Sequence, residues 1–352
     1  MPDTKSVKTS KTGTRLAIFR DLLLAKCTRR RIPLMANLLL TNRCNLKCFY
    51  CYVDTFHRTV EDLGTQKVIE VIDILHSHGT KIMVLLGGEP LVRNDLGVII
   101  EHINRKRMIC EVITNGFHVE KWLDPLRLAD SVCVSLDGDQ AANDRNRGPG
   151  SFQTAMEAIR ILRENRIPTR IKAVITRYNI DALDFLADFV RDNRILMTSS
   201  VAVVYEARHY DAASPWLDGP QTRQFLEKLR ALKRSGVPIG YSYQALDYCI
   251  NWPHEYHAVI DAAPDADTRR YIKCLRKDFS LYMDADGTMY PCANLWGKAG
   301  KNILTDGFQA AWDQFRQYPC FCCGNIPDVD LSLLLGLSPT GILGAVRYFT
   351  GD

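Results

Sequence analysis

Long apolar runs are missing from this sequence. No stretch reaches the roughly 18 uninterrupted apolar residues that a transmembrane helix requires, and the lysine-rich start, residues 1–14, has no apolar signal segment. No internal repeat or low-complexity segment is evident. The net charge of +5 is too small to argue for a nucleic-acid partner. These absences predict a cytoplasmic protein that neither spans a membrane by helices nor binds nucleic acid.

Cysteine, in contrast, is abundant. The chain has 352 residues, 12 of them cysteine, and its hydrophobic content of 46% is ordinary for a globular protein. In a cytoplasmic chain, cysteine serves metal binding or catalysis more often than disulfides. The length allows one large domain or two moderate ones.

Three of the cysteines stand close together in one loop. Cys44, Cys48 and Cys51 have the spacing C-x3-C-x2-C, directly after the strand-like run 38–40. Thiolates are soft ligands that select zinc, copper(I) or iron–sulfur clusters. Structural zinc takes four protein ligands, which leaves three thiolates one short. Three thiolates on a four-iron cluster would leave one iron open to a substrate or cofactor.

This loop resembles the signature of the radical S-adenosylmethionine (SAM) enzymes, including the aromatic Tyr50 before the last cysteine. In that family the three cysteines hold a 4Fe-4S cluster, and the amino and carboxyl groups of SAM chelate the open iron. One electron then cleaves SAM to methionine and a 5'-deoxyadenosyl radical, which takes hydrogen from a substrate. The resemblance therefore implies an enzyme with both cofactors and an electron donor such as flavodoxin or ferredoxin. A chance match or a zinc knuckle is the alternative.

Short apolar strands alternate with helical stretches from residue 36 to about residue 243. The expected strands are Ala36–Leu40, Lys81–Leu86, Cys110–Thr114, Ser131–Leu136, Arg170–Thr176 and Ser200–Tyr205. The expected helices are Gln66–His78, Asp95–Asn104, Glu120–Leu128, Ser151–Asn165 and Ala182–Asp192. This α/β pattern predicts a parallel sheet with right-handed crossovers. Six such units suit the partial (β/α)6 TIM-like barrel that the resemblance implies.

A glycine-rich turn follows the second expected strand. Gly87, Gly88, Glu89 and Pro90 match the GGEP motif of the family, which hydrogen-bonds the SAM amino group. Glycine permits close backbone approach, and Glu89 supplies a carboxylate. Functional residues of such barrels lie at the C-terminal ends of the strands, where this turn falls.

The next two strand ends supply further cofactor-binding candidates. Asn115 follows the third strand, and Ser135 and Asp137 end the fourth, where they share one face. A hydroxyl and a carboxylate suit a ribose diol or an amino-acid head group. Arg147 matches a family arginine and is expected to pair with the SAM carboxylate, although a solvated charge run is the alternative. Asn143 stands where the family more often has histidine.

Substrate contacts are expected after the sixth strand. Glu206 and His209 fall near the catalytic end in this register and are the catalytic candidates. Ordinary surface polarity is the competing interpretation.

The second half of the chain carries another group of cysteines. Cys274 and Cys292 flank an expected hairpin whose turn is Asp284–Gly287, and Cys320 and Cys323 form a C-x2-C knuckle. The arrangement resembles the SPASM or shortened twitch extension of radical SAM enzymes and implies one auxiliary 4Fe-4S cluster on these four cysteines. Cys322 is the rival for the last position, and a structural zinc site is the alternative. The remaining cysteines are expected to be small buried apolar residues, namely Cys27, Cys110, Cys133 and Cys249.

The chain therefore divides into four expected parts. They are an N-terminal lead and amphipathic helix (1–35), a radical SAM partial barrel (36–245), a small α+β auxiliary-cluster domain (246–326) and an apolar tail (327–352). The helix in 15–35 is expected to cap the domain, with a membrane-surface role as the alternative. The apolar tail leaves the same alternative open, so peripheral membrane contact stays a hypothesis.

The substrate is expected to be a small molecule or lipid-like, with hydrogen abstraction as the first step of an oxidation or of bond formation. A ribosomally made peptide is the alternative, disfavoured because the short lead leaves no room for a leader-binding domain before the barrel. A non-enzymatic iron–sulfur or zinc scaffold is the alternative from another class.

Overall fold

The computed structural model describes residues 8–53, 60–202, 216–256, 258–261 and 270–339, and every statement below concerns these residues. The catalytic candidates Glu206 and His209 lie outside them.

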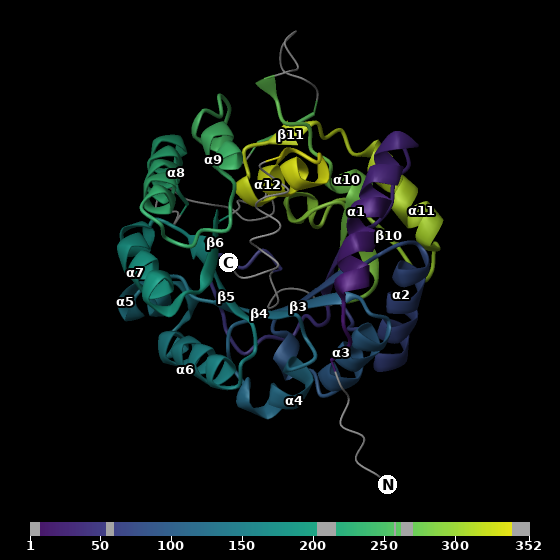
Figure 1. The fold of residues 1–352 in the computed structure, drawn as a ribbon, viewed down its shortest axis with the longest axis horizontal. Coiled ribbons are helices and arrows are strands. Elements are labelled where there is room, and N and C mark those ends of the chain that lie inside the picture. The colour runs from purple at the N-terminus through teal and green to yellow at the C-terminus, as the bar shows by residue number, and fades with distance from the viewer. Residues whose placement is uncertain (1–7, 54–59, 203–215, 257, 262–269, 340–352) are drawn as a thin grey trace.

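Six βα units form most of the fold. The strands are β1 (Met35–Leu39), β2 (Ile82–Leu86), β3 (Ile109–Thr114), β4 (Ser131–Ser135), β5 (Thr169–Ile175) and β6 (Leu196–Val201). The helices that follow them are α2 (Thr65–Ser77), α3 (Leu96–Arg105), α4 (Leu123–Leu126), α6 (Ser151–Glu164), α7 (Leu183–Asn193) and α8 (Gly219–Arg234). Each strand pairs in parallel with the next, and the helices lie around the outside of the curved sheet (Figure 1). The predicted partial (β/α)6 barrel is therefore confirmed.

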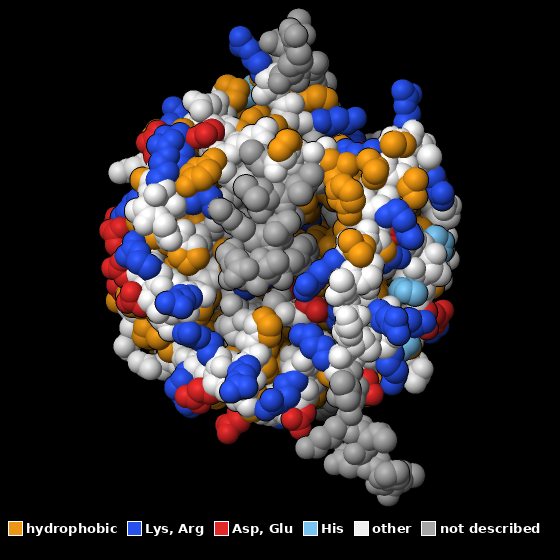
Figure 2. Space-filling model, in the orientation of Figure 1, with side chains coloured by type: hydrophobic (Ala, Val, Ile, Leu, Met, Phe, Trp, Pro, Cys, Tyr) orange, Lys and Arg blue, Asp and Glu red, His pale blue; other side chains and the backbone are white. Residues whose placement is uncertain are grey.

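The outer rim of this barrel is polar. Figure 2 shows lysine and arginine side chains interspersed with acidic ones around the ring of helices. An exposed mixture of both signs is typical of a helix layer that faces water.

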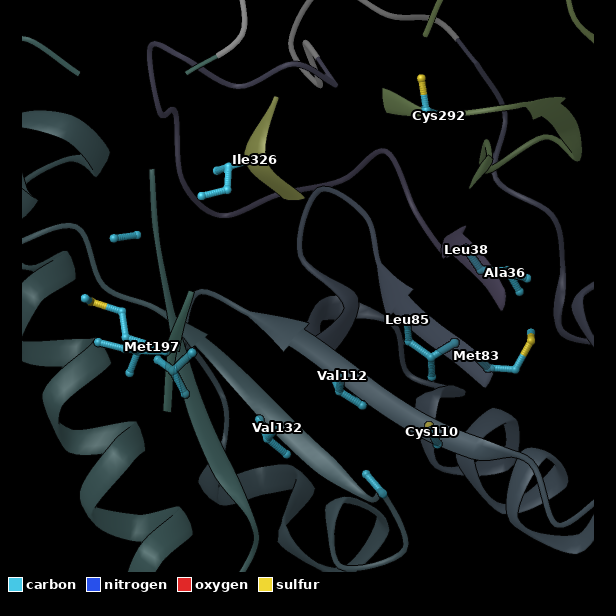
Figure 3. Close-up of a cluster of buried hydrophobic side chains, with 14 of the residues drawn as sticks. Ala36, Leu38, Met83, Leu85, Cys110, Val112, Val132, Met197, Cys292 and Ile326 are labelled. Carbon is cyan, nitrogen blue, oxygen red and sulfur yellow. The ribbon is translucent and has the colours of Figure 1, made fainter. Parts of the chain in front are cut away.

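Alternate residues of each strand pack on opposite faces of the sheet. Outward-facing side chains such as Leu38, Leu85 and Val112 lie in neighbouring positions and belong to the main core with the helices (Figure 3). Inward-facing side chains such as Leu86 join a second cluster with Trp296 and with residues next to Cys51. Because both faces are covered, a strand such as β2 is a continuous apolar run.

The second half of the chain continues the same sheet. Strand β8 (Ser280–Met283) pairs in parallel with β1, followed by β9 (Thr288–Tyr290) and β10 (Lys301–Asn302) in antiparallel order. The predicted hairpin is thus confirmed, with Gly287 at a φ of 94° closing its turn. However, it extends the barrel sheet rather than forming a sheet of its own.

Shorter elements make up the rest of the second half. They are α9 (Tyr243–Ile250), β7 (Val259–Ile260), α10 (Arg276–Phe279), α11 (Phe308–Asp313), β11 (Cys322–Cys323) and α12 (Ile326–Leu335). Strand β7 pairs with β11, which carries part of the C-x2-C knuckle.

An N-terminal helix, α1 (Thr12–Cys27), covers one end of the molecule. Its Leu22 and Ala25 pack with Phe279 and Leu335, so the expected capping role is confirmed. Within the described chain, no helix combines the length and hydropathy needed to cross a bilayer.

The structure differs from the expected barrel elements in two places. The sixth strand is β6 (Leu196–Val201), earlier than expected, because Arg194 takes a left-handed conformation at the end of α7 and starts the strand sooner. The charged stretch before Gly148 is a helix, α5 (Gln140–Arg147), whose first turn Asp139 caps by accepting a hydrogen bond from the Ala142 amide.

Candidate metal centres

The cysteine loop follows β1 and is held by the glycine-rich turn after β2. The Gly88 amide donates to the Thr41 carbonyl at 2.7 Å, and the Glu89 amide donates to the Arg43 carbonyl at 2.9 Å. Asp62 accepts hydrogen bonds from the Thr41 hydroxyl and from the Asn42 amide. The backbone on both sides of the loop's entry is therefore fixed before Cys44 is reached.

The two glycines are required by this contact. A Cβ atom on Gly88 would lie 2.3 Å from the Arg43 carbonyl oxygen, and one on Gly87 would lie 2.8 Å from that of Thr41. Neither glycine has a positive φ, so close approach alone excludes a side chain. The close backbone approach expected from the motif is made to the cysteine loop itself.

The three thiols of the loop lie within electrostatic range of one another. The pKa of the Cys44 thiol is raised to about 12 and that of Cys48 to about 11, mainly by burial and in smaller part by the neighbouring cysteines. All three cysteines are half-buried. Three soft sulfur donors on one loop match the three-thiolate set of a 4Fe-4S cluster, and the cluster would have to displace their protons.

Glu89 joins the ends of two strands behind this loop. Its carboxylate accepts hydrogen bonds from the Asn115 amide (2.7 Å), the Thr114 hydroxyl (2.7 Å) and the Leu91 amide (3.0 Å). Burial raises its pKa to about 7 even though these three donors lower it. The side chain of Asn115 donates to the Asn45 side chain at 2.8 Å, so β3 also touches the cysteine loop.

Asp137 and Arg147 form a buried ion pair beside the loop. Arg147 Nε lies 2.9 Å from Asp137 Oδ2, and the Tyr50 hydroxyl donates to the same carboxylate at 2.6 Å. Burial alone would lower the pKa of Arg147, but Asp137 and Tyr50 outweigh it and raise the pKa. The Val174 amide also donates to Asp137, at 2.8 Å. The predicted residues Tyr50, Asp137 and Arg147 are thus brought together, with each other as partners.

Other polar residues of this stretch support the backbone. Asn143 accepts from the Asp137 amide at 2.9 Å and donates to the Ser151 hydroxyl at 2.8 Å. Asp144 accepts from the amides of Gly150 and Phe152 and so caps α6, which Ser151 does not. These contacts explain the polar run without a ligand.

Two predicted residues have plainer surroundings. Ser135 is half-buried at the end of β4, opposite Lys172 of β5. Pro90 opens a short 3-10 helix, Pro90–Val92, where its missing amide costs nothing.

The second group of cysteines meets at the far end of the sheet. Cys274 and Cys320 are within hydrogen-bonding distance of each other, and Cys292 and Cys323 both interact electrostatically with Cys274 and Cys320. Burial raises the pKa of Cys292 and of Cys323. In the described parts of the chain, no three His, Cys, Asp or Glu side chains converge on a single-ion site.

Cys322, the rival for the fourth position, is also within electrostatic range of Cys274. It is fully buried in the main core, where burial raises its pKa to about 11 and the nearby Tyr248 hydroxyl partly offsets this. Because β11 alternates its side chains, Cys322 and Cys323 point to opposite faces. The geometry favours Cys323 over Cys322 as the fourth member of the group.

A buried ion pair that was not predicted from the sequence lies next to these cysteines. Arg276 Nη1 lies 3.0 Å from Asp328 Oδ1, and Arg276 is in electrostatic contact with Cys292 and Cys274. Asp328 also accepts from the side chains of Asn294 and Asn325. The pair joins α10 to α12. Because these two helices are far apart in the sequence, no local sequence pattern could have predicted the pair.

Known proteins and a family model match this chain in sequence. A family model described as the radical SAM superfamily matches residues 38–190. The mycofactocin maturase MftC of Mycolicibacterium smegmatis is 33% identical over 339 residues, covering 89% of this chain and 78% of that protein. The Fe-coproporphyrin III synthase of Methanosarcina barkeri is 28% identical over 291 residues, covering 76% and 72%.

Solved structures show the same fold. The crystal structure of Streptococcus suis SuiB superposes with a TM-score of 0.63 at 15% identity, covering 87% of this chain and 72% of that one. Taken with the extent of similarity to MftC, the matches establish that the chain belongs to the radical SAM superfamily. It is therefore an enzyme whose cofactors are a 4Fe-4S cluster and SAM.

Proposed function

We propose that Cys44, Cys48 and Cys51 hold the radical SAM cluster and that SAM binds between this loop and the ends of β2 to β4. The observation that carries the proposal is the buried Glu89 carboxylate, held by two strand ends directly behind the cysteine loop. When bound, the cluster supplies the electron that cleaves SAM to methionine and a 5'-deoxyadenosyl radical.

Different residues of the chain would contribute to SAM binding in different ways. Glu89 keeps acceptor capacity beyond its three hydrogen bonds, so it can receive a bond from the SAM ammonium group. Gly87, Gly88 and Pro90 fix the backbone that presents it, and Asn115 and Ser135 line the neighbouring strand ends. Each of these assignments is a prediction from position.

Asp137, Arg147 and Tyr50 support the site by holding one another. Because Asp137 already neutralises Arg147, we propose that the pair positions Tyr50 and the loop around Cys48. The carbonyl of Arg147 lies 4.0 Å from the Cys48 sulfur, which places the pair against the loop.

A second 4Fe-4S cluster is proposed on Cys274, Cys292, Cys320 and Cys323. It would accept an electron from the substrate radical, or bind or position the substrate. We propose residues 246–326 as its domain, within which β8 pairs with β1 of the barrel sheet. A one-electron donor of the flavodoxin or ferredoxin kind would reduce the first cluster.

The first candidate substrate is a small molecule. Two relatives are named for such products: the Fe-coproporphyrin III synthase, and the pre-heme d1 synthase of Dinoroseobacter shibae at 27% identity over 272 residues. Glu206 and His209 stay candidates for substrate contact.

A ribosomally made peptide is the second candidate, and a specific observation favours it. MftC is named a maturase and matches 89% of this chain, and one SuiB structure is bound to its precursor peptide SuiA. The peptide candidate therefore stands beside the small molecule.

The test is anaerobic reconstitution with iron, sulfide, SAM and reductant, followed by mass spectrometry. Formation of 5'-deoxyadenosine is expected, and its absence would overturn the proposal. Adding a metabolite extract or the peptides encoded beside the gene then separates the candidates, because only a true substrate is recovered with a changed mass. Asn115→Asp serves as a site variant, and the exposed Lys67→Gln on α2 as its matched surface control.

A further inference from the structure

Helix α1 presents an apolar face to solvent. Leu16, Phe19, Leu23 and Leu24 are 69%, 51%, 45% and 54% exposed. They are four of the seven large hydrophobic residues that are exposed in the described chain. Isolated exposed apolar residues are ordinary, but four on one helix form a patch that marks an interaction surface.

The opposite face of the same helix is already used. Leu22 and Ala25 are buried against the rest of the protein, near Phe279 and Leu335. With 3.6 residues per turn, Leu16, Phe19 and Leu23 fall together on the other side. Packing onto the barrel therefore does not explain the exposed apolar face.

Basic residues surround this face. Arg15, Arg20, Arg29 and Arg30 are all exposed on or just after the helix. Asp21 is the only acidic residue from residue 12 to residue 30, and it is bonded to Arg20 at 2.8 Å. In Figure 2, hydrophobic and basic side chains gather at the upper right, where Figure 1 draws α1.

We propose that α1 docks the enzyme on the surface of an anionic lipid bilayer. Leu16, Phe19 and Leu23 would enter the boundary between head groups and acyl chains, while the arginines contact lipid phosphates. The charge of the helix favours an anionic bilayer over a second copy of the chain, because two copies would bring two sets of arginines together and these would repel each other. The structure leaves α1 attached to the barrel through Leu22 and Ala25, so docking requires no unfolding.

The proposal does not depend on the radical chemistry, so the two can fail separately. The test is flotation of the full chain with vesicles of phosphatidylcholine alone or with added phosphatidylglycerol. Binding is expected only to the anionic vesicles and should fall with added salt. In a Phe19→Trp variant, the indole fluorescence should shift to the blue on vesicle addition.

Variants test whether vesicle binding depends on the exposed apolar face of α1. Leu16→Ser with Phe19→Ser and Leu23→Ser should lower vesicle affinity at least tenfold, and Arg29→Gln with Arg30→Gln should lower it severalfold. The matched control is Val98→Ser with Tyr243→Ser, which removes exposed apolar side chains elsewhere and should change nothing. Circular dichroism and 5'-deoxyadenosine formation verify that each variant is folded.

Three outcomes would overturn the proposal. They are no binding to anionic vesicles, equal binding by the triple serine variant, and a concentration-dependent dimer that the triple serine variant abolishes. The last would assign the face to a second copy of the chain.

Discussion

At the residue scale, Glu89 has one observed role, which is structural, and one proposed role in binding SAM. Its carboxylate is buried and joins the ends of β2 and β3, and the same oxygens lie where the SAM ammonium group is expected. A structural role and a binding role therefore have to be separated by experiment.

Replacing Glu89 by Gln should weaken SAM binding. The shape is kept, but one charge-assisted hydrogen bond is lost, which costs about 1.5–3 kcal/mol, or roughly ten- to a hundredfold in dissociation constant. Isothermal titration with the anaerobically reconstituted protein measures it. An unchanged dissociation constant, together with a lowered melting temperature, would leave Glu89 only its structural role.

The raised pKa of Glu89 predicts that the free energy of unfolding depends on pH, and the same variant can test this. Burial raises the pKa of Glu89 from 4.5 to about 7, so in the folded protein the neutral form persists to a higher pH than in the unfolded chain. Its contribution to stability is then fully present below pH 4.5 and is lost as the pH rises towards 7, by about 3 kcal/mol. The stability gap between the wild type and Glu89→Gln, measured by urea unfolding from pH 5 to pH 8, should shrink with rising pH. A constant gap would contradict the assignment.

Site residues could be predicted from the sequence where they belong to a short local motif. Cys44, Gly88 and Glu89 are carried by short motifs that fold where they stand. The partnership of Asp137 with Arg147 was not predicted, because Arg147 arrives on α5, a helix with little apolar pattern. Its expected partner was the SAM carboxylate, and only the folded arrangement shows Asp137 beside it.

At the scale of elements, the turn after β2 and the cysteine loop act as one unit. Gly88→Ala should break this unit, because the added methyl group would overlap the Arg43 carbonyl. Iron at the first cluster and SAM cleavage should both be lost, while the barrel stays folded. Gly148→Ala is a contrasting control: its Cβ would meet open space, although its φ of 116° adds local strain. Normal iron content in Gly88→Ala would contradict the close contact.

Strand β11 makes a second prediction about elements. Because its two cysteines point to opposite faces, Cys323→Ser should lose the iron of the second cluster, and Cys322→Ser should keep it. Iron analysis and electron paramagnetic resonance of the two variants compare them directly. Loss of iron in Cys322→Ser alone would reverse the assignment.

The elements themselves were largely predictable where strands alternate with helices. β6 was misplaced because its residues Thr198, Ser199 and Ser200 give little apolar signal. The pairing of β8 with β1 was not foreseen, because it joins segments more than 240 residues apart and leaves no local pattern.

For the whole molecule, two clusters predict about eight irons per chain after anaerobic reconstitution. Replacing Cys44, Cys48 and Cys51 together by Ala should abolish SAM cleavage and keep about half of the iron, since the loop contributes little to the core. Iron and zinc are measured by mass spectrometry, with circular dichroism as the folding control. A variant that holds one tight zinc and no iron would refute the auxiliary cluster, and a variant that still cleaves SAM would refute the first.

The parallel pairing of β8 with β1 has one more consequence. Strand β1 leads into the first group of cysteines and β8 into the second, in a register that sets Met35 opposite Ser280 and Leu38 opposite Met283. Backbone hydrogen bonds between two adjacent strands therefore fix the distance between the two sites. Their separation is set once, when the sheet forms, and a moving hinge between domains would have no means to change it.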